Sequence, residues 1–346
     1  MSARIDALRA RTSERFLVTD LVNVRYLTGF ESSNAALLVD PDGAAQLFTD
    51  FRYIEGAEAV PGVEAVLARR ALIADLAERL NGRLAFEADA LPYMQYEVLR
   101  SGGLELAPTN GVVESLRAVK DEEEIERLRR AALAADRAFE ALTAEAWAGH
   151  SERELAWRLH QLLHAHGADT IAFDPLIVAG PNGSKPHTNP SDRIIEERTL
   201  VVADWGARID GYNSDCTRTL ATGELPRELR RAYDACLEAQ LAAVDGIKPG
   251  LTGVEADALA RGVLEEWGYE KRFGHGLGHG VGLAVHEAPR LSTESRNMLE
   301  VGNVITIEPG VYLPGLGGVR IEDLAVVRED GVELLTSFPK GLTVVG

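Results

Sequence analysis

The first third of the chain alternates short apolar runs with amphipathic stretches. Apolar runs at residues 35–39 and 45–49 flank a Pro-Asp-Gly sequence at 41–43, which favours turn angles and predicts a β-hairpin. Leucine and isoleucine at helical spacing over residues 70–80, with Gly82 just beyond, predict a helix. Further strands are predicted at 16–18, 84–86 and 104–106. Strands that alternate with helices indicate an α/β (α+β) fold with a mixed sheet.

Three later segments begin with a capping box, in which Asp, Ser or Thr is followed three residues later by Glu. The boxes at Asp121, Ser151 and Thr252 each predict the start of a helix. The predicted helix ends are Ala148, Gly167 and Gly268. The pattern of short apolar runs gives way to a long, charged helix at Asp121, so we place the domain boundary there. The expected domains are residues 1–120 and 121–346.

Length and charge narrow the class of protein. The chain has 346 residues, of which 46% are hydrophobic, so we expect two globular domains and not a disordered chain. With 36 Lys and Arg against 54 Asp and Glu, the formal net charge is −18. Such a chain repels phosphate backbones and anionic lipids, so we expect no nucleic-acid partner and no membrane partner.

The cysteine content and the N-terminal sequence bear on the compartment. Cys216 and Cys236 are too few for a disulfide framework and fit a reducing environment. Residues 1–14 mix charged and apolar positions, unlike a signal peptide. No apolar run approaches the roughly 18 residues that span a bilayer. We therefore expect a cytoplasmic protein.

A strand at residues 200–206 is followed by an Asp-Gly turn at 210–211, which predicts a hairpin. Residues equally distant from the turn pair across it, so Asp204 lies opposite Thr217. Asp215 precedes Thr217 by two residues and projects from the same face, because side chains alternate along a strand. The two carboxylates are then one diagonal step apart, where they repel each other unless a cation or a proton separates them.

A second hairpin repeats this arrangement. Residues 304–308 form a β-branched strand that ends in Glu308, and residues 319–322 return after a glycine-rich loop. A loop centred on Gly315 places Glu308 opposite Glu322. Taken alone, Glu308 would suit an exposed strand position, and an Asp-Gly hairpin is usually a solvated turn. Together, four carboxylates that end apolar strands are hard to explain as surface residues.

Residues 274–287, between the hairpins, hold three of the eight histidines: His275, His279 and His286. Five glycines in this stretch disfavour a helix and let the backbone approach another segment closely, and we predict a histidine-bearing strand. Four carboxylates with an imidazole suit two divalent ions that share bridging ligands. Carboxylate-rich ligation favours Mn²⁺ over a thiolate-bound structural Zn²⁺. A structural Ca²⁺ site fits less well, because Ca²⁺ prefers all-oxygen loops.

These residues resemble the metal-dependent "pita-bread" peptidases, which include Xaa-Pro dipeptidase (prolidase), aminopeptidase P and methionine aminopeptidase. The matching motifs are residues 204–206, 213–219, 275–287, 306–310 and 320–323. The N-terminal half resembles the creatinase-type domain at residues 25–30 and 48–53. The resemblance covers nearly the whole chain, and its N-terminal domain points away from methionine aminopeptidase, which lacks one.

The resemblance implies a dinuclear metal centre. The implied ligands are Asp204, Asp215, His279, Glu308 and Glu322. Asp215 and Glu322 would bridge two divalent ions, and a bridging hydroxide would attack the scissile carbonyl. Mn²⁺ is the expected metal, with Co²⁺ and Zn²⁺ as alternatives. Creatinase shares the fold but uses no metal and lacks these carboxylates.

The resemblance also implies catalytic roles. Glu308 would carry a proton from the nucleophile to the leaving nitrogen, and His275 and His286 would bind the carbonyl oxygen and the tetrahedral intermediate. Arg320 would hold a bridging carboxylate from outside the metal ligands. His187 matches a substrate-contacting histidine. Asp50 and Arg52 are expected to bind substrate as residues donated by the partner subunit of a homodimer.

The expected reaction is hydrolysis of Xaa-Pro bonds. This tertiary amide has no N–H and its ring fixes φ, so it needs a dedicated pocket. We expect a dipeptidase of the prolidase type. Aminopeptidase P, which acts on longer peptides, keeps the same site and is the alternative. A catalytically inactive pita-bread binding module is disfavoured because all five candidate ligands are present.

Overall fold

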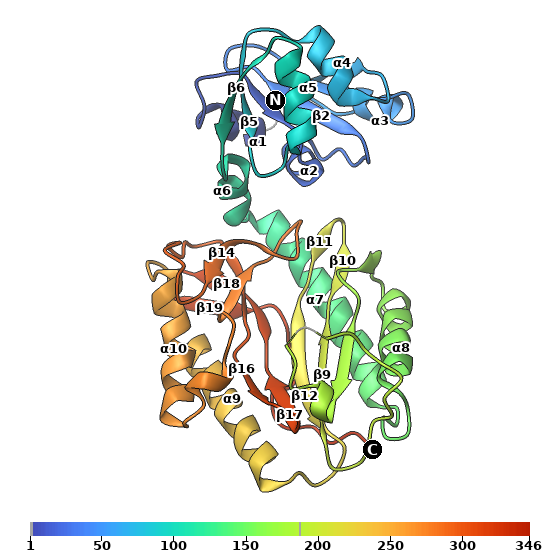
Figure 1. Ribbon diagram of the computed structural model, residues 1–346, viewed down its shortest axis with the longest axis vertical. Helices are drawn as coiled ribbons and strands as arrows, with labels where there is room; N and C mark the ends of the chain where they lie inside the picture. Colours follow the sequence, from blue (N-terminus) through green and yellow to red (C-terminus); the bar gives the residue numbers. More distant parts are fainter. Residues whose placement is uncertain (1–2, 187) are drawn as a thin grey trace. The chain divides into compact units, whose positions relative to one another are not determined.

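The computed structural model describes residues 3–186 and 188–346. The chain packs as two compact units, one that ends at Arg117 and one that begins at Ala118. Each unit combines strands with helices, as predicted (Figure 1). In the part of the chain that the structure describes, no helix is both long and apolar enough to cross a membrane.

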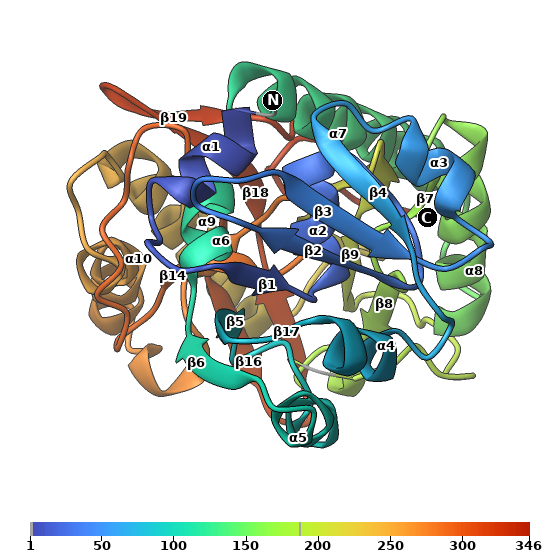
Figure 2. The same ribbon diagram turned by 90° about the horizontal axis from the view of Figure 1, so that it is seen from above.

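The first unit is built on a six-stranded mixed sheet, in which β1 runs antiparallel to β2 and parallel to β5. In spatial order its strands are β4 (Val63–Leu67), β3 (Ala45–Thr49), β2 (Ala35–Val39), β1 (Phe16–Val18), β5 (Arg83–Glu87) and β6 (Glu105–Thr109). The neighbouring strands β1 to β4 are visible side by side in Figure 2. The helices are α1 (Ala3–Arg9), α2 (Leu21–Thr28), α3 (Ile54–Glu58), α4 (Leu72–Arg79), α5 (Tyr93–Ser101) and α6 (Val112–Ala118). The β2–β3 pairing confirms the predicted first hairpin.

One half of the second unit packs two long helices against short sheets. The helices are α7 (Glu122–Thr143) and α8 (Glu152–Ala165), and the strands are β7 (Thr170–Ile171), β8 (Leu176–Ala179), β9 (Leu200–Trp205), β10 (Ala207–Ile209), β11 (Tyr212–Asn213) and β12 (Cys216–Ala221). A short 3₁₀ turn spans Gly180–Asn182. Trp205 is fully buried and stacks on Phe139 of α7, with 3.6 Å between the ring centroids. This core holds β9, which carries Asp204, against α7.

The other half repeats the design with a separate core. Helices α9 (Arg227–Gly246) and α10 (Gly253–Glu266) lie on the opposite side of the strands from α7 and α8 (Figure 1). The strands are β13 (Gly278–Gly280), β14 (Glu287–Leu291), β15 (Val304–Ile307), β16 (Gly310–Leu313), β17 (Gly317–Arg320), β18 (Asp323–Arg328) and β19 (Gly331–Leu334), and a 3₁₀ turn spans Glu270–Arg272. Both cysteines are buried in these cores.

The three predicted capping boxes are all present, with reciprocal side-chain bonds at Asp121, Ser151 and Thr252. The predicted extension of the first helix to Ala148 was wrong, because α7 ends at Thr143. The chain turns there so that Trp147 can enter the core, where its indole N–H donates to the carbonyl of Leu142. A tertiary contact therefore overrides the helical pattern at this end.

Both predicted hairpin registers are confirmed. Thr217 pairs with Asp204, and in the second hairpin Gly310 pairs with Arg320 while Ile307 pairs with Asp323. Glu308 and Glu322 lie between these two ladders, where the strands part. The predicted histidine strand was largely wrong: only Gly278–Gly280 is a strand in that stretch, and the rest is loop up to β14.

Candidate metal centre

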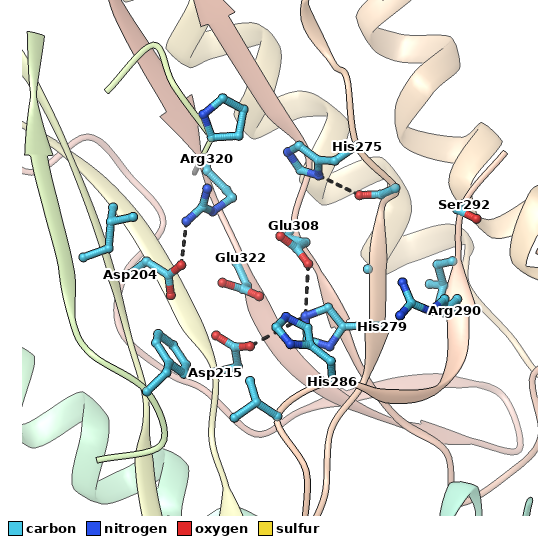
Figure 3. Close-up of a pocket in the computed structure, with 17 residues that line it drawn as sticks. Asp204, Asp215, His275, His279, His286, Arg290, Ser292, Glu308, Arg320 and Glu322 are labelled. Carbon is cyan, nitrogen blue, oxygen red and sulfur yellow. Dashed lines mark hydrogen bonds and ion pairs between the residues drawn. The ribbon is translucent and has the colours of Figure 1, made fainter. Parts of the chain in front are cut away.

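The two hairpins and the histidine-bearing segment at residues 274–287, here called the histidine loop, surround one cavity of about 410 Å³ (Figure 3). Eight residues predicted for the site line it: Asp204, Asp215, His275, His279, His286, Glu308, Arg320 and Glu322. They come from β9, β13, β17 and the segments that flank β12, β13, β14, β15 and β18. The cavity thus joins segments more than a hundred residues apart in the sequence.

Four carboxyl groups face this cavity, and their burial opposes ionisation. Burial raises the pKa of Asp215 well above its usual range, and the Glu322 and Asp204 carboxylates raise it further. Burial and the charges of Glu308 and Asp204 likewise raise the pKa of Glu322. Burial raises the pKa of Glu308 to about 7. Several carboxylates this close become fully charged only when a cation compensates them.

His279 presents a lone pair to this cluster. Its Nδ1 lies 3.1 Å from the carbonyl of Gly280, and a carbonyl only accepts, so we assign the ring proton to Nδ1. Nε2 is then an acceptor, 3.4 Å from Glu308 Oε1 and 3.7 Å from Asp215 Oδ2. Burial lowers the pKa of His279 to about 4, so the ring is neutral. A lone pair that faces two carboxylates is an arrangement that a cation stabilises.

The donor set fits a metal ion. One ligand atom each of Asp215, His279 and Glu322 lie within 4.8 Å of one another. Asp204 Oδ1 is buried and has no hydrogen-bond partner among the described residues. An unpaired buried carboxylate oxygen is costly, and a bound ion would satisfy it. Oxygen donors with one imidazole suit hard or borderline divalent cations.

Arg320 connects the carboxylates of Asp204 and Glu322 through hydrogen bonds. Its Nη2 donates to Asp204 Oδ2 at 2.6 Å, and its Nε donates to Thr217 Oγ1 at 3.0 Å. The Thr217 hydroxyl in turn donates to Glu322 Oε2 at 2.6 Å. The resemblance implied that Arg320 holds a bridging carboxylate; in the structure it contacts Asp204 directly and is linked to Glu322 through Thr217.

His275 is held by Tyr312, a residue that the sequence did not single out. His275 Nδ1 lies 2.8 Å from the Gly276 carbonyl, and Nε2 lies 2.9 Å from the Tyr312 hydroxyl. In the neutral ring, Nδ1 is therefore the donor and Nε2 accepts from Tyr312. Burial raises the pKa of Tyr312 to about 12, so the phenol keeps its proton.

Comparison with known proteins identifies the family. A model of metallopeptidase family M24 matches residues 126–329. The chain belongs to metallopeptidase family M24. A model of the creatinase/prolidase N-terminal domain matches residues 3–119. The predicted creatinase-like and pita-bread domains are thereby confirmed as the fold.

Members of the family cover most of the chain. The Xaa-Pro dipeptidase of Pyrococcus furiosus is 44% identical over 243 residues, which is 70% of each chain. The solved Xaa-Pro dipeptidase from Bacillus anthracis is 39% identical, with a TM-score of 0.95 over 99% of each chain. The X-Pro aminopeptidase from Thermotoga maritima MSB8 is 32% identical, with a TM-score of 0.88 over 96% of this chain and 97% of that chain.

Membership of M24 makes this chain a peptidase that uses divalent metal. The carboxylate cluster, the Nε2 lone pair of His279 and the unsatisfied oxygen of Asp204 fit that requirement. The five ligands and the catalytic roles expected from the sequence remain predictions, which the arrangement around the cavity supports.

Two of the predicted substrate residues lie in the first unit. Arg52 donates Nε and Nη2 to the two oxygens of buried Asp50, each at 2.8 Å. This guanidinium holds the pKa of Asp50 well below its usual range. The pair lies in the turn that follows β3, and its role toward substrate stays a prediction. His187 lies outside the described residues.

Sequence reasoning missed Arg290 as well as Tyr312. Arg290 lies on β14 and lines the cavity, on the side opposite Asp204 in Figure 3. Its position four residues after His286 was the available signal, because a strand that continues from a site loop can return a side chain to the site. Among the described residues, no carboxylate pairs with this guanidinium.

Proposed function

We propose that this M24 metallopeptidase hydrolyses the Xaa-Pro bond of dipeptides. The observation that carries the proposal is the guanidinium of Arg290 in the cavity wall, which pairs with no carboxylate among residues 3–186 and 188–346. In an Xaa-Pro dipeptide, a free carboxylate lies one residue from the scissile bond, and Arg binds carboxylates in a planar, two-pronged geometry. The names of the similar proteins from Pyrococcus furiosus and Bacillus anthracis support the same substrate class.

The apolar part of the cavity suits a proline ring. Phe173, Leu176, Val285 and Leu291 contribute to its lining. The ring is a compact hydrophobic group, and its nitrogen offers no N–H that the pocket would need to satisfy. A volume of about 410 Å³ is at the small end of ligand sites, which supports a short substrate.

The metal would be held by Asp204, Asp215, His279, Glu308 and Glu322. When bound, two divalent ions supply a water nucleophile at neutral pH and polarise the scissile carbonyl. Glu308 would take the proton of the attacking water and deliver it to the proline nitrogen, which leaves as a neutral amine. Arg320 keeps Asp204 oriented and, through Thr217, orients Glu322.

The two other histidines would act on the carbonyl oxygen as it gains negative charge. His286 lines the cavity beside His279, with 4.3 Å between the ring centroids. Both ring nitrogens of His275 already have partners, Gly276 and Tyr312. His275 can therefore donate to the substrate only by exchanging one of these contacts when substrate binds.

Product analysis by mass spectrometry is the direct test. The metal-loaded protein should split Ala-Pro and Gly-Pro into single amino acids and leave Xaa-Pro-Xaa peptides intact. Release of the first residue from the longer peptides would instead support the aminopeptidase P alternative. A protein that cleaves neither substrate would support an inactive binding module and contradict the proposal.

Removal of metal should abolish the activity. Treatment with EDTA should reduce Ala-Pro hydrolysis to background, because the carboxylates and imidazole alone cannot generate the nucleophile. We propose Mn²⁺ as the native ion, so Mn²⁺ should restore the rate best, with Co²⁺ next. Elemental analysis of the restored protein should give two ions per chain. Full activity in metal-free protein would contradict this mechanism.

Replacing Arg290 should weaken dipeptide hydrolysis selectively. Arg290→Met should lower kcat/KM for Ala-Pro about 10–100-fold, because a hydrogen-bonded charge pair contributes roughly 1.5–3 kcal/mol. Hydrolysis of Ala-Pro amide, which lacks the carboxylate, should change little. The matched control is Arg296→Met, at an exposed arginine, which should leave both rates unchanged. Equal losses on dipeptide and amide would contradict the assigned role.

We further propose that the protein is a cytoplasmic homodimer in which Asp50 and Arg52 of one subunit serve the site of the other. His187 keeps its predicted role in substrate binding, and the domain boundary keeps its predicted place between residues 120 and 121. Sedimentation equilibrium would reveal a stable monomer if the dimer proposal is wrong.

A further inference from the structure

A buried ion pair lies outside the ligands and catalytic residues described above. Lys120 Nζ lies 2.6 Å from Glu287 Oε1, and the two side chains are only 1% and 5% exposed. Burying two charges costs about as much as their attraction returns, so such a pair adds little net stability over an apolar pair. The pair does fix the positions of the two side chains relative to each other, so the contacts that each side chain makes decide what the pair holds in place.

Lys120 is firmly anchored at its own end. Its backbone N–H donates to the carbonyl of Gly302 at 2.9 Å, and its Nζ also donates to the Ala118 carbonyl at 3.3 Å. The Asn303 side chain donates to that same Ala118 carbonyl at 3.0 Å. The ammonium group is therefore a fixed point against which another segment can be held.

Glu287 connects the fixed ammonium group of Lys120 to the histidine loop. It directly follows His286, and its carboxylate packs against the backbone of the loop: Ala284 N–H donates to Oε2 at 3.4 Å. A Cβ atom on Gly282 would collide with the same carboxylate, so the loop and Glu287 are in close contact. From the other side, the Asn213 amide donates to the carbonyls of Gly282 and Leu283 at 2.9 and 3.1 Å.

We propose that Lys120 is a positioning residue, which acts through Glu287 to hold His286 at the reacting carbonyl. The loop between Gly282 and Glu287 carries His286 and Val285, both of which line the cavity. Lys120 itself does not line the cavity, so it acts only through its partner. This inference rests on the proposed function in one respect, that His286 acts on the substrate.

The test compares three variants in the metal-loaded, full-length protein with Ala-Pro as substrate. Lys120→Met should lower kcat by about 10–100-fold with little change in KM, because small displacements of a catalytic group cost rates of this order. Lys120→Arg, which keeps the charge, should recover most of the rate. The matched control is Lys248→Met, at an exposed lysine, which should match the wild type.

A purely structural role is distinguished by a double-mutant cycle. In a His286→Gln background, Lys120→Met should slow the reaction by less than about 3-fold, because the group that it positions is already absent. A loss as large as in the wild-type background would overturn the proposal. So would a wild-type kcat in Lys120→Met.

The neutral pair Lys120→Met/Glu287→Gln keeps the test decisive if the single variant does not fold. With no unpaired buried charge, the double variant should unfold at the wild-type temperature and bind the wild-type amount of metal, yet remain slow. Wild-type kcat in this variant would overturn the proposal. If wild-type protein itself fails to cleave Ala-Pro, the proposed function fails, and that outcome is distinct from any result with these variants.

Discussion

Replacing Asp215 with asparagine should lower the peptidase activity by more than about 100-fold and reduce the bound divalent metal. Asp215 contributes one of three ligand atoms that lie within 4.8 Å of one another, with His279 and Glu322. Changes to groups that merely support ligands cost about 10–100-fold, so loss of a ligand itself should cost more. Elemental analysis and Ala-Pro hydrolysis measure the two effects on the same sample.

When metal is absent, the same substitution should raise the stability of the folded protein. In metal-free protein, Asp215 is buried among carboxylates that raise its pKa, so removing it relieves repulsion. Metal-free Asp215→Asn should therefore melt above metal-free wild type, by about 2–4 °C for each kcal/mol of repulsion relieved. Added Mn²⁺ should raise the melting temperature of wild type far more than that of the variant.

The direction in which the stability of the metal-free protein changes with pH follows from the same group of acids. The pKa of Glu308 rises from 4.5 to about 7 in the folded protein, so the folded state binds this proton more tightly than the unfolded chain. Its contribution to stability is complete below about pH 4.5 and is lost as the pH rises through about 7. The melting temperature of chelator-treated wild type should thus fall with rising pH, and the melting temperature of chelator-treated Asp215→Asn should fall less.

Asp210→Asn is the matched control for these experiments. Asp210 lies in the exposed hairpin turn with φ of 50°, a conformation that Asn adopts readily, and among the described residues its charge partner is exposed Arg130. This variant should retain the activity, the metal content and both melting temperatures. A metal-free Asp215→Asn that melts below metal-free wild type would contradict the account of repulsion.

Replacing Arg218 with methionine should lower the free energy of unfolding by about 3–5 kcal/mol. Arg218 is buried, pairs with Asp323 at 2.8 Å and donates to the carbonyls of Glu322 and Phe338. Without the guanidinium, these buried acceptors lose a partner and Asp323 keeps Lys340 as its remaining cation. Because Arg218 also fixes the backbone of Glu322, metal affinity should fall as well.

Urea unfolding followed by tryptophan fluorescence measures this loss. All four tryptophans, Trp147, Trp157, Trp205 and Trp267, belong to the second unit, so the signal reports that unit alone. Arg230→Met is the matched control, because Arg230 pairs with Asp234 at the surface and should contribute less than about 1 kcal/mol. Similar losses for the two arginines would show that burial of the Arg218 network does not govern its stability contribution.

Local pattern alone predicted much of the second unit. The capping boxes at Asp121, Ser151 and Thr252 form because each needs only a side chain and a backbone N–H three residues away. The hairpin registers also follow from short-range rules, since the turn and the alternation of side chains set which residues face each other. Both rules operate within a few residues, so the sequence contains all the information that they require.

The histidine loop shows where local pattern stops. The glycines there predicted close backbone approach but not what approaches: a Cβ atom on Gly278 would collide with the carbonyl of Thr306, and one on Gly280 with that of Ala288. Which backbone approaches is decided by the fold of the whole unit. The same holds at Trp147, whose burial ends α7 earlier than its helical pattern predicts.

The sequence by itself therefore indicated the family, through the resemblance of its motifs, and it predicted the acidic and histidine residues of the candidate site from residue type, spacing and strand alternation. Only the tertiary structure decided how those residues are held. The proton of His279 is assigned by a backbone carbonyl, Tyr312 reaches the loop residue His275 from β16, and Lys120 meets Glu287 across 167 residues of sequence. Such contacts carry no sequence period, because they arise between segments that meet only when the cores of the second unit are packed.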